Sequence, residues 1–150
     1  MSVYNVINKV KPTEIYNFCA MSHVKISSEL ENYTFQTNTL GILNILQSVR
    51  ILGLGEKTKI YQASTSEMYG NTTDGSQMLT EYSEMNPVSP YGISKLAGEH
   101  WCEYYFNKYG VDVRSIRYPG LIGYKSLPGG GTTDYAVDIY HKALNDEKFT

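Results

Sequence analysis

Hydrophobic and polar residues alternate along this chain in short segments that are typical of β-strands. Residues 14–18 (EIYNF), 59–65 (KIYQAST) and 112–119 (DVRSIRYP) are rich in β-branched and aromatic side chains, and polar or glycine-containing stretches flank them. We therefore predict three strands at these positions.

Longer segments between the strands have helical periodicity. The segment 33–52 repeats apolar side chains every three or four residues and ends at two glycines; its apolar positions include Leu40, Leu43, Leu46, Val49 and Ile51. Residues 91–108 form a second predicted helix, residues 3–10 the tail of an earlier one, and the segment TDYAVDIYHKALN a further one opened by a threonine or aspartate cap. Residues 19–32 and 70–89 are expected to be polar loops.

Strands that alternate with helices of ten or more residues imply parallel βαβ crossovers. The sequence thus predicts an α/β fold with a doubly wound parallel sheet. A length of 150 residues suits one domain with one core.

Composition excludes several classes of function. The formal net charge of −2, with scattered basic residues, gives no reason to expect nucleic acid binding. No apolar run is long enough to span a membrane, and Cys19 and Cys102 have no metal-ligand spacing. We expect a cytoplasmic protein without a metal site.

Ligands of open α/β sheets bind where the strands end. The second strand ends in ASTSEMYG, which places Thr65 and Glu67 in this region. A polar turn between strand and loop would explain these residues by itself. The functional interpretation is that Thr65 hydrogen-bonds a substrate oxygen and that Glu67 is an additional acid or base.

A tyrosine and a lysine four residues apart follow at the start of the next helix. Tyr91 and Lys95, in PYGISKLAG, share one helix face, and a nearby ammonium favours a phenolate and lowers the phenol pKa. The chain has 14 tyrosines, so the spacing also arises by chance, and Tyr104 with Lys108 repeats it. We predict that Tyr91 and Lys95 form the functional pair, because the second pair lies further along the helix, away from the strand ends.

The order of Ser/Thr followed by Tyr-x-x-x-Lys in an α/β chain resembles the extended short-chain dehydrogenase/reductase family. The resemblance implies that Tyr91 is the acid–base group, that Lys95 holds the cofactor ribose, and that Thr65 orients the substrate oxygen. TNTLGILNIL resembles the Asn-x-x-Gly helix of the family, which places Asn38 near the cofactor. YNFCAMSHV is similar to the segment after the fourth strand, where Cys19 and Ala20 would pass an NAD or NADP dinucleotide.

Two parts of the chain resemble different enzymes of that family. Residues 8–70 are similar to GDP-mannose 4,6-dehydratases, whereas residues 91–150 are similar to the short-chain type of L-threonine 3-dehydrogenase. A divergent enzyme, a natural recombinant and a mis-joined sequence all stay open as explanations.

The chemistry of the two reactions distinguishes them. A 4,6-dehydratase oxidises C4 of the sugar, removes the C5 proton and expels the C6 hydroxyl, so it needs a second base, which the resemblance assigns to Glu67. A threonine dehydrogenase needs only Tyr91, and the loop 129–137 (GGGTTDYAV) favours this alternative. GDP-mannose is the preferred substrate because Glu67 is at a catalytic position.

The glycine-rich dinucleotide fingerprint of this fold is absent from the sequence. The chain therefore resembles the second half of a Rossmann-like domain with the start of a substrate-binding region, spanning residues 1–150. The resemblance implies a small-molecule substrate and a homodimer when the protein is intact. A truncated, non-catalytic product is a further alternative, and His23 is expected either to contact substrate or to have a surface or capping role.

Overall fold

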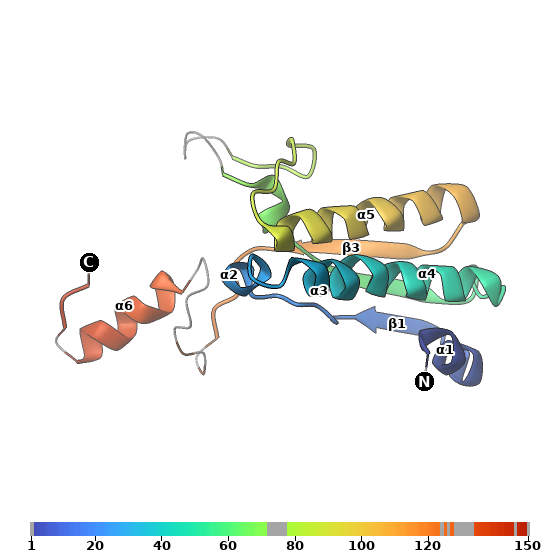
Figure 1. The fold of residues 1–150 in the computed structure, drawn as a ribbon, viewed down its shortest axis with the longest axis horizontal. Coiled ribbons are helices and arrows are strands. Elements are labelled where there is room, and N and C mark those ends of the chain that lie inside the picture. Colours follow the sequence, from blue (N-terminus) through green and yellow to red (C-terminus); the bar gives the residue numbers. More distant parts are fainter. Residues whose placement is uncertain are drawn as a thin grey trace.

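The computed structural model describes residues 2–71, 78–123, 125, 127, 134–145 and 147–149. Helices and strands alternate along the chain, as the sequence predicts (Figure 1). In chain order they are α1 (Val3–Val10), β1 (Glu14–Asn17), α2 (Val24–Ser27), α3 (Glu31–Phe35), the π-helical turn η1 (Gln36–Leu40), α4 (Gly41–Ile51), β2 (Lys59–Thr65), the 3₁₀ turn η2 (Ser66–Tyr69), α5 (Pro90–Tyr109), β3 (Val113–Tyr118) and α6 (Tyr135–Leu144).

The three strands form one parallel sheet in the order β1-β2-β3. Ile15 lies beside Ile60, and Ile60 lies beside Val113, so the three strands begin at the same edge. Helices α4 and α5 cover one face of this sheet (Figure 1). The α/β prediction is confirmed, and the described chain is a partial Rossmann-like fold.

The core lies between the sheet and these two helices. Its most buried apolar side chains come from α4, from β2 and from the link between α5 and β3, and Cys102 and Tyr105 contribute from α5; among the most buried are Ile42, Leu46, Val49, Ile60 and Val111. Gly98 lets α5 approach α4 closely, because a methyl group there would lie 3.2 Å from Ile42 Cγ2. This close packing fixes α5, which carries the predicted Tyr91–Lys95 pair.

Aromatic side chains line the opposite face of the sheet. Tyr16 and Phe18 are more than half exposed, and both rings contact Tyr61 at centroid distances of 5.9 and 5.3 Å. The hydroxyl of Tyr61 is hydrogen-bonded to that of Tyr118 on β3. Burial and this bond raise the pKa of Tyr61 to about 12.

Two segments differ from the predicted elements. Residues 24–27 form the short helix α2 within the predicted loop, because His23 Nδ1 accepts a hydrogen bond from Ile26 N at 3.4 Å. His23 thus caps this short helix. The predicted helix 33–52 contains the π-helical turn η1 between α3 and α4.

Local residues define both ends of α5. Ser89 Oγ accepts a hydrogen bond from Gly92 N at 3.0 Å, and Pro90 occupies the first turn, where its missing N–H is not needed. Gly110 ends the helix with a φ of 67°.

Helix α6 has no buried residue and stands apart from the sheet (Figure 1). Asp134 occupies its N-cap position without a side-chain hydrogen bond to the first turn. Within the described ranges, no helix has both the length and the apolar character needed to cross a bilayer.

Candidate active site

The predicted tyrosine and threonine meet at the carboxyl end of β2. Tyr91 stands in the first turn of α5 and is only 8 % exposed. Thr65 ends β2, and its hydroxyl is near enough to the Tyr91 phenol to lower the pKa of that phenol. The same hydroxyl accepts a hydrogen bond from Glu67 N at 3.2 Å, so it links the end of the strand to the 3₁₀ turn.

Lys95 lies one helical turn after Tyr91 and is buried, with 5 % exposure. Its Nζ donates a hydrogen bond to the carbonyl oxygen of Ala63 on β2, 2.9 Å away. Nζ is 5.8 Å from the centroid of the Tyr91 ring. Burial lowers the pKa of Lys95 to about 8, because the low-dielectric surroundings disfavour its charged form.

The expected lowering of the Tyr91 pKa is not observed. Burial raises the pKa of Tyr91, the Thr65 hydrogen bond opposes this shift, and the nearby Glu67 carboxylate adds to it. The prediction was wrong in sign because desolvation of the phenolate is the largest contribution. Lys95 donates its hydrogen bond to the Ala63 carbonyl and not to the Tyr91 phenol, so it does not offset this desolvation.

Glu67 follows Thr65 on η2, close to the start of α5. A methyl group on Gly92 would lie 2.8 Å from the carbonyl oxygen of Glu67, so the absence of a side chain at Gly92 lets η2 approach the helix. Gly70 ends the turn at a φ of 68°, where a methyl group would overlap the Asn86 carbonyl. These two glycines set the position of Glu67 beside Tyr91.

Asn38, predicted near the cofactor, is buried in the π-helical turn η1. Its Oδ1 accepts from Met21 N at 2.8 Å, and its Nδ2 donates to Met21 O at 3.1 Å and to Ser94 Oγ at 2.9 Å. Asn38 thus ties the segment after β1 to α5, one residue before Lys95. Both the oxygen and the nitrogen of its side-chain amide are hydrogen-bonded to protein groups, which indicates that Asn38 supports the structure of the site.

Cys19 and Ala20 follow directly after β1. The backbone N–H of Cys19 donates to Asn17 Oδ1 at 3.3 Å, and the Cys19 side chain is exposed while Ala20 is partly exposed. Asn17 Nδ2 in turn donates to Gln62 Oε1 at 2.7 Å, across from β1 to β2. The segment after β1 thus lies at the same end of the sheet as Thr65, Tyr91 and Lys95.

The second Tyr–Lys pair is not part of this cluster. Tyr104 is 45 % exposed, and its ring packs edge-on against Trp101 and Tyr105. Its hydroxyl lies 3.4 Å from that of Tyr109 at the far end of α5. Tyr104 therefore lies outside the group formed by Thr65, Tyr91 and Lys95.

Three hydroxyl side chains that the sequence analysis did not single out position the start of α5. Ser27 Oγ accepts from Tyr91 N at 3.2 Å, Ser94 Oγ donates to Tyr91 O at 2.8 Å, and Thr39 Oγ1 donates to Ser94 O at 2.9 Å. The partners of Ser27 and Thr39 are distant in sequence, so no local pattern reveals these two, whereas Ser94 bonds within its own helix.

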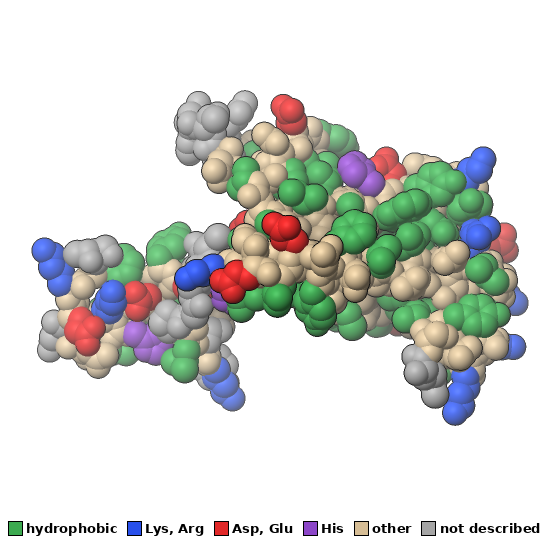
Figure 2. All heavy atoms as spheres, in the orientation of Figure 1, with side chains coloured by type: hydrophobic (Ala, Val, Ile, Leu, Met, Phe, Trp, Pro, Cys, Tyr) green, Lys and Arg blue, Asp and Glu red, His purple; other side chains and the backbone are tan. Residues whose placement is uncertain are grey.

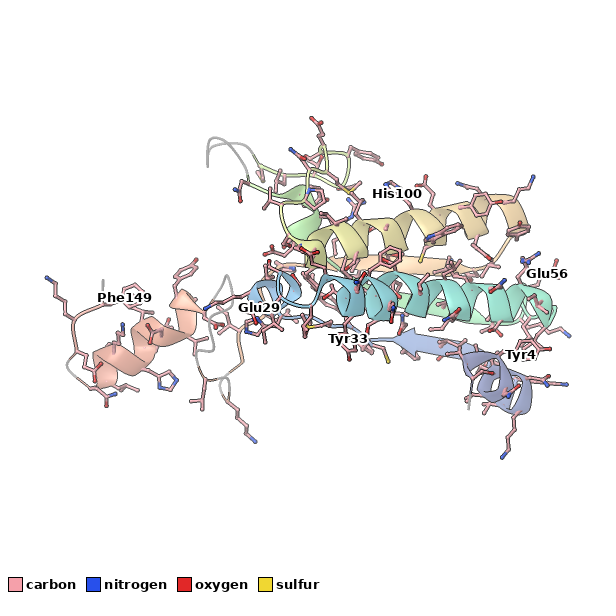
Figure 3. The ribbon with its side chains drawn as sticks, viewed as in Figure 1. Tyr4, Glu29, Tyr33, Glu56, His100 and Phe149 are labelled. Carbon is pink, nitrogen blue, oxygen red and sulfur yellow. The ribbon has the colours of Figure 1, made fainter. Side chains whose placement is uncertain are left out.

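No cluster of metal ligands occurs among the described residues. His100 is exposed on the outer side of α5 and lies 3.8 Å from Glu103 (Figure 3). Residues 129–133 of the predicted substrate loop lie outside the described residues.

Known proteins match this chain over nearly its whole length. The family model described as GDP-mannose 4,6 dehydratase matches residues 1–119. An uncharacterised epimerase/dehydratase from Staphylococcus saprophyticus is 35 % identical over 97 % of the chain and 43 % of that relative.

Two solved structures each align with nearly the whole chain, and thus with both residues 8–70 and residues 91–150. A partial consensus L-threonine 3-dehydrogenase is 41 % identical with a TM-score of 0.80, covering 98 % of this chain and 46 % of that one. A UDP-glucose 4-epimerase from Thermus thermophilus in complex with NAD is 30 % identical with a TM-score of 0.80, covering 98 % and 46 %.

The fold, the site and these matches define the class of protein. The chain belongs to the extended short-chain dehydrogenase/reductase family, in its epimerase/dehydratase group. It spans less than half the length of the relatives named above.

Proposed function

We propose that this chain supplies the acid–base groups of an NAD- or NADP-dependent enzyme that oxidises a secondary alcohol. The observation that supports the proposal is the proximity of the Thr65 hydroxyl to the Tyr91 phenol, beside the buried Lys95. A bound nicotinamide dinucleotide would accept the hydride from the alcohol carbon.

In this proposal Tyr91 takes the hydroxyl proton of the substrate at its phenolic oxygen. The Thr65 hydroxyl both donates and accepts, so it can hold the substrate oxygen in line with that phenol. Because burial raises the Tyr91 pKa, the phenol is mostly protonated at neutral pH in the chain alone. A cationic group brought closer to the phenol would favour the phenolate, and Lys95 is the nearest candidate on the same helix face.

The residues fit the nicotinamide end of a dinucleotide. Lys95 has three donor hydrogens, and the described bond to Ala63 uses one of them. The others are suited to the oxygens of a ribose diol. Cys19 and Ala20 present the backbone of the strand end, and Asn38 supports that backbone through Met21.

GDP-mannose is the substrate that we propose first, in a 4,6-dehydratase reaction. After oxidation at C4, the C5 proton and the C6 hydroxyl are lost and the hydride would return from the cofactor to C6, so the reaction requires a further acid–base group. Glu67 is near enough to Tyr91 to raise its pKa, and we assign the second acid–base role to this carboxylate. The family model that residues 1–119 match is the one described as GDP-mannose 4,6 dehydratase.

L-threonine is the second candidate substrate. The supporting observation is the 41 % identity with the partial consensus L-threonine 3-dehydrogenase over 98 % of this chain. This reaction ends after oxidation of the β-hydroxyl, so Glu67 would have no chemical step.

The experiment uses a completed protein, in which the segments that the S. saprophyticus relative has outside the aligned region are joined to this chain. Turnover of GDP-mannose and of L-threonine is measured with NAD and with NADP. A dehydratase loses elimination in Glu67→Gln but still binds GDP-mannose. Threonine oxidation that survives Glu67→Gln within a few-fold would support the second candidate instead.

We also propose that the completed protein is a homodimer. Hydrophobic side chains gather on the outward face of α4 and α5 (Figure 2), and the exposed ones near it include Tyr33, Ile93, Trp101 and Tyr104. Contiguous apolar surface of this kind is typical of an interface. Sedimentation of the completed protein, with Trp101→Glu as the interface variant, tests this assembly; a monomeric parent protein would refute it.

A further inference from the structure

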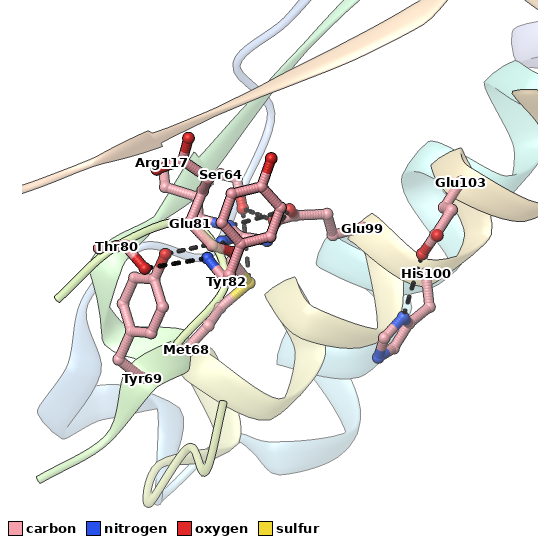
Figure 4. Close-up of polar contacts among 10 residues, drawn as sticks. All are labelled: Ser64, Met68, Tyr69, Thr80, Glu81, Tyr82, Glu99, His100, Glu103 and Arg117. Carbon is pink, nitrogen blue, oxygen red and sulfur yellow. Dashed lines mark hydrogen bonds and ion pairs between the residues drawn. The ribbon is translucent and has the colours of Figure 1, made fainter. Parts of the chain in front are cut away.

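A second polar cluster lies beside the candidate active site. It consists of Ser64, Tyr69, Glu81, Glu99 and Arg117, which we call the Arg117 cluster (Figure 4). The Arg117 and Glu99 side chains are each 20 % exposed, so the ion pair is largely shielded from water. The proposed reaction steps do not use any of these side chains.

Arg117 joins three separate parts of the chain. From β3, its Nε and one terminal nitrogen donate to Glu99 Oε1 on α5 at 2.9 and 2.7 Å. Its other terminal nitrogen donates to the Tyr69 hydroxyl at 2.6 Å and to the Glu81 carbonyl at 2.9 Å. Such a planar, forked donor fixes both the distance and the orientation of its partners.

Two of the partners of Arg117 belong to the same structural elements as the proposed catalytic groups. Tyr69 follows Glu67 on η2, and Glu99 follows Lys95 by one turn of α5. Glu99 Oε2 also accepts a hydrogen bond from Ser64 Oγ at 2.8 Å, directly before Thr65. The cluster therefore connects the turn that carries Glu67 to the helix that carries Tyr91.

We propose that Arg117 is a positioning residue that holds the η2 turn and the segment 78–86 against α5, and thereby fixes Glu67 beside Tyr91. This inference rests on the proposed function of Glu67 as a second acid–base group. Arg117 itself does not touch the reacting atoms in this account; it acts through Tyr69, Glu81 and Glu99.

The test uses the chain as it is, without substrate. Hydrogen exchange is followed by mass spectrometry in residues 66–71, 78–86 and, as a reference, 42–49 of α4. The Tyr91 pKa is measured by NMR on protein with ¹³C-labelled tyrosine, assigned with Tyr91→Phe. The variants are Arg117→Met and Tyr69→Phe, and Arg114→Met is the matched control on the same strand, since its side chain is 81 % exposed.

Arg117→Met is expected to raise exchange about tenfold or more in 66–71 and 78–86 while 42–49 stays within twofold. The Tyr91 pKa should fall toward its ordinary value of 10.0, because the Glu67 carboxylate is no longer held nearby. Loss of the positive charge of Arg117 alone would raise the Tyr91 pKa. The direction of the shift therefore distinguishes displacement of Glu67 from loss of that charge. Arg114→Met should change neither quantity.

Tyr69→Phe removes one hydroxyl and keeps the Arg117–Glu99 pair, so it decides the outcome if Arg117→Met does not fold. It should cause the same changes at smaller amplitude. Unchanged exchange in 66–71, an equal rise in 42–49, or a Tyr91 pKa that stays or rises would overturn the proposal. Because no turnover is measured, this result is independent of whether Glu67 proves to be catalytic.

Discussion

Lys95 Nζ donates a hydrogen bond to the carbonyl oxygen of Ala63 at 2.9 Å, and this contact holds the buried ammonium against the end of β2. The bond compensates part of the cost of removing the charge from water, but burial still lowers the Lys95 pKa to about 8. The lowered pKa of Lys95 has a measurable consequence for the free energy of unfolding.

Stability should depend on the charge of Lys95 above pH 8. The unfolded chain keeps this lysine protonated up to about pH 10.4, whereas the folded chain releases the proton near pH 8. The unfolded state therefore binds more protons in this range, and the Lys95 contribution to the free energy of unfolding increases as pH rises. Below pH 8 that contribution is lost, because the buried group is charged.

Urea unfolding of the chain and of Lys95→Met at pH 7.5 and 9.5 measures this contribution. The difference between the two proteins should shift by about 2 kcal/mol in favour of the parent at the higher pH. Cys102, whose pKa burial raises to about 12, contributes with the opposite sign in both proteins and cancels. A difference that does not vary with pH would contradict the lowered pKa.

Gly92→Ala should destabilise the chain and disturb the candidate site. The added methyl would lie 2.8 Å from the Glu67 carbonyl oxygen, so η2 must move away from α5, at a cost of about 1–3 kcal/mol. Gly41→Ala is the matched control on α4, because nothing lies within 4 Å of its methyl position. Equal free energies of unfolding for the two variants would show that the close approach at Gly92 is unimportant.

Asn38→Asp should lose about 1–3 kcal/mol of stability, because the new carboxylate cannot donate to Met21 O and Ser94 Oγ. Asn44→Asp, at an exposed position of α4, is the control. Thermal unfolding of both variants measures the effect. If Asn38→Asp were as stable as Asn44→Asp, Asn38 would not anchor the segment after β1.

The two cysteines should differ strongly in reactivity. Cys102 is buried among core residues, and burial raises its thiol pKa to about 12, whereas Cys19 is exposed. Iodoacetamide at pH 8 should modify Cys19 at least about a hundredfold faster than Cys102 in the folded chain. Peptide mapping by mass spectrometry gives both rates, and comparable labelling of Cys102 would mean that the core opens readily.

The sequence alone predicts most of the fold, because strands and helices depend on local patterns. The strand 59–65 and the helix beginning near Tyr91 are observed at their predicted positions. The π-helical turn at 36–40 was missed because the Asn38 contacts reach Met21 and Ser94, which are distant in sequence.

The site was only partly predictable for a related reason. Residue type and spacing led to the proposal of Thr65, Tyr91 and Lys95, but the pKa of a phenol depends on how deeply it is buried. Arg117 and Glu99 were missed because nothing in their spacing shows that β3 and α5 bring them together.

The chain alone should bind NAD or NADP weakly and catalyse no turnover. In the proposed function the residues of this chain hold the nicotinamide end of a dinucleotide, and the sequence has no glycine-rich pyrophosphate loop. In the part of the chain that the structure describes, β1 is an edge strand, which also favours aggregation. Calorimetric titration with each dinucleotide checks this; micromolar binding with steady turnover would mean that the 150 residues form a complete active site.

The most direct test of the proposed chemistry compares Tyr91→Phe with Tyr104→Phe in the completed protein. Both variants remove one hydroxyl from α5, and only Tyr91 contacts Thr65. Steady-state turnover of GDP-mannose and of L-threonine should fall by about 10²–10⁴-fold in Tyr91→Phe and stay within a few-fold in Tyr104→Phe. Turnover that persists in Tyr91→Phe while Tyr104→Phe is inactive would contradict the assignment of Tyr91 as the acid–base group.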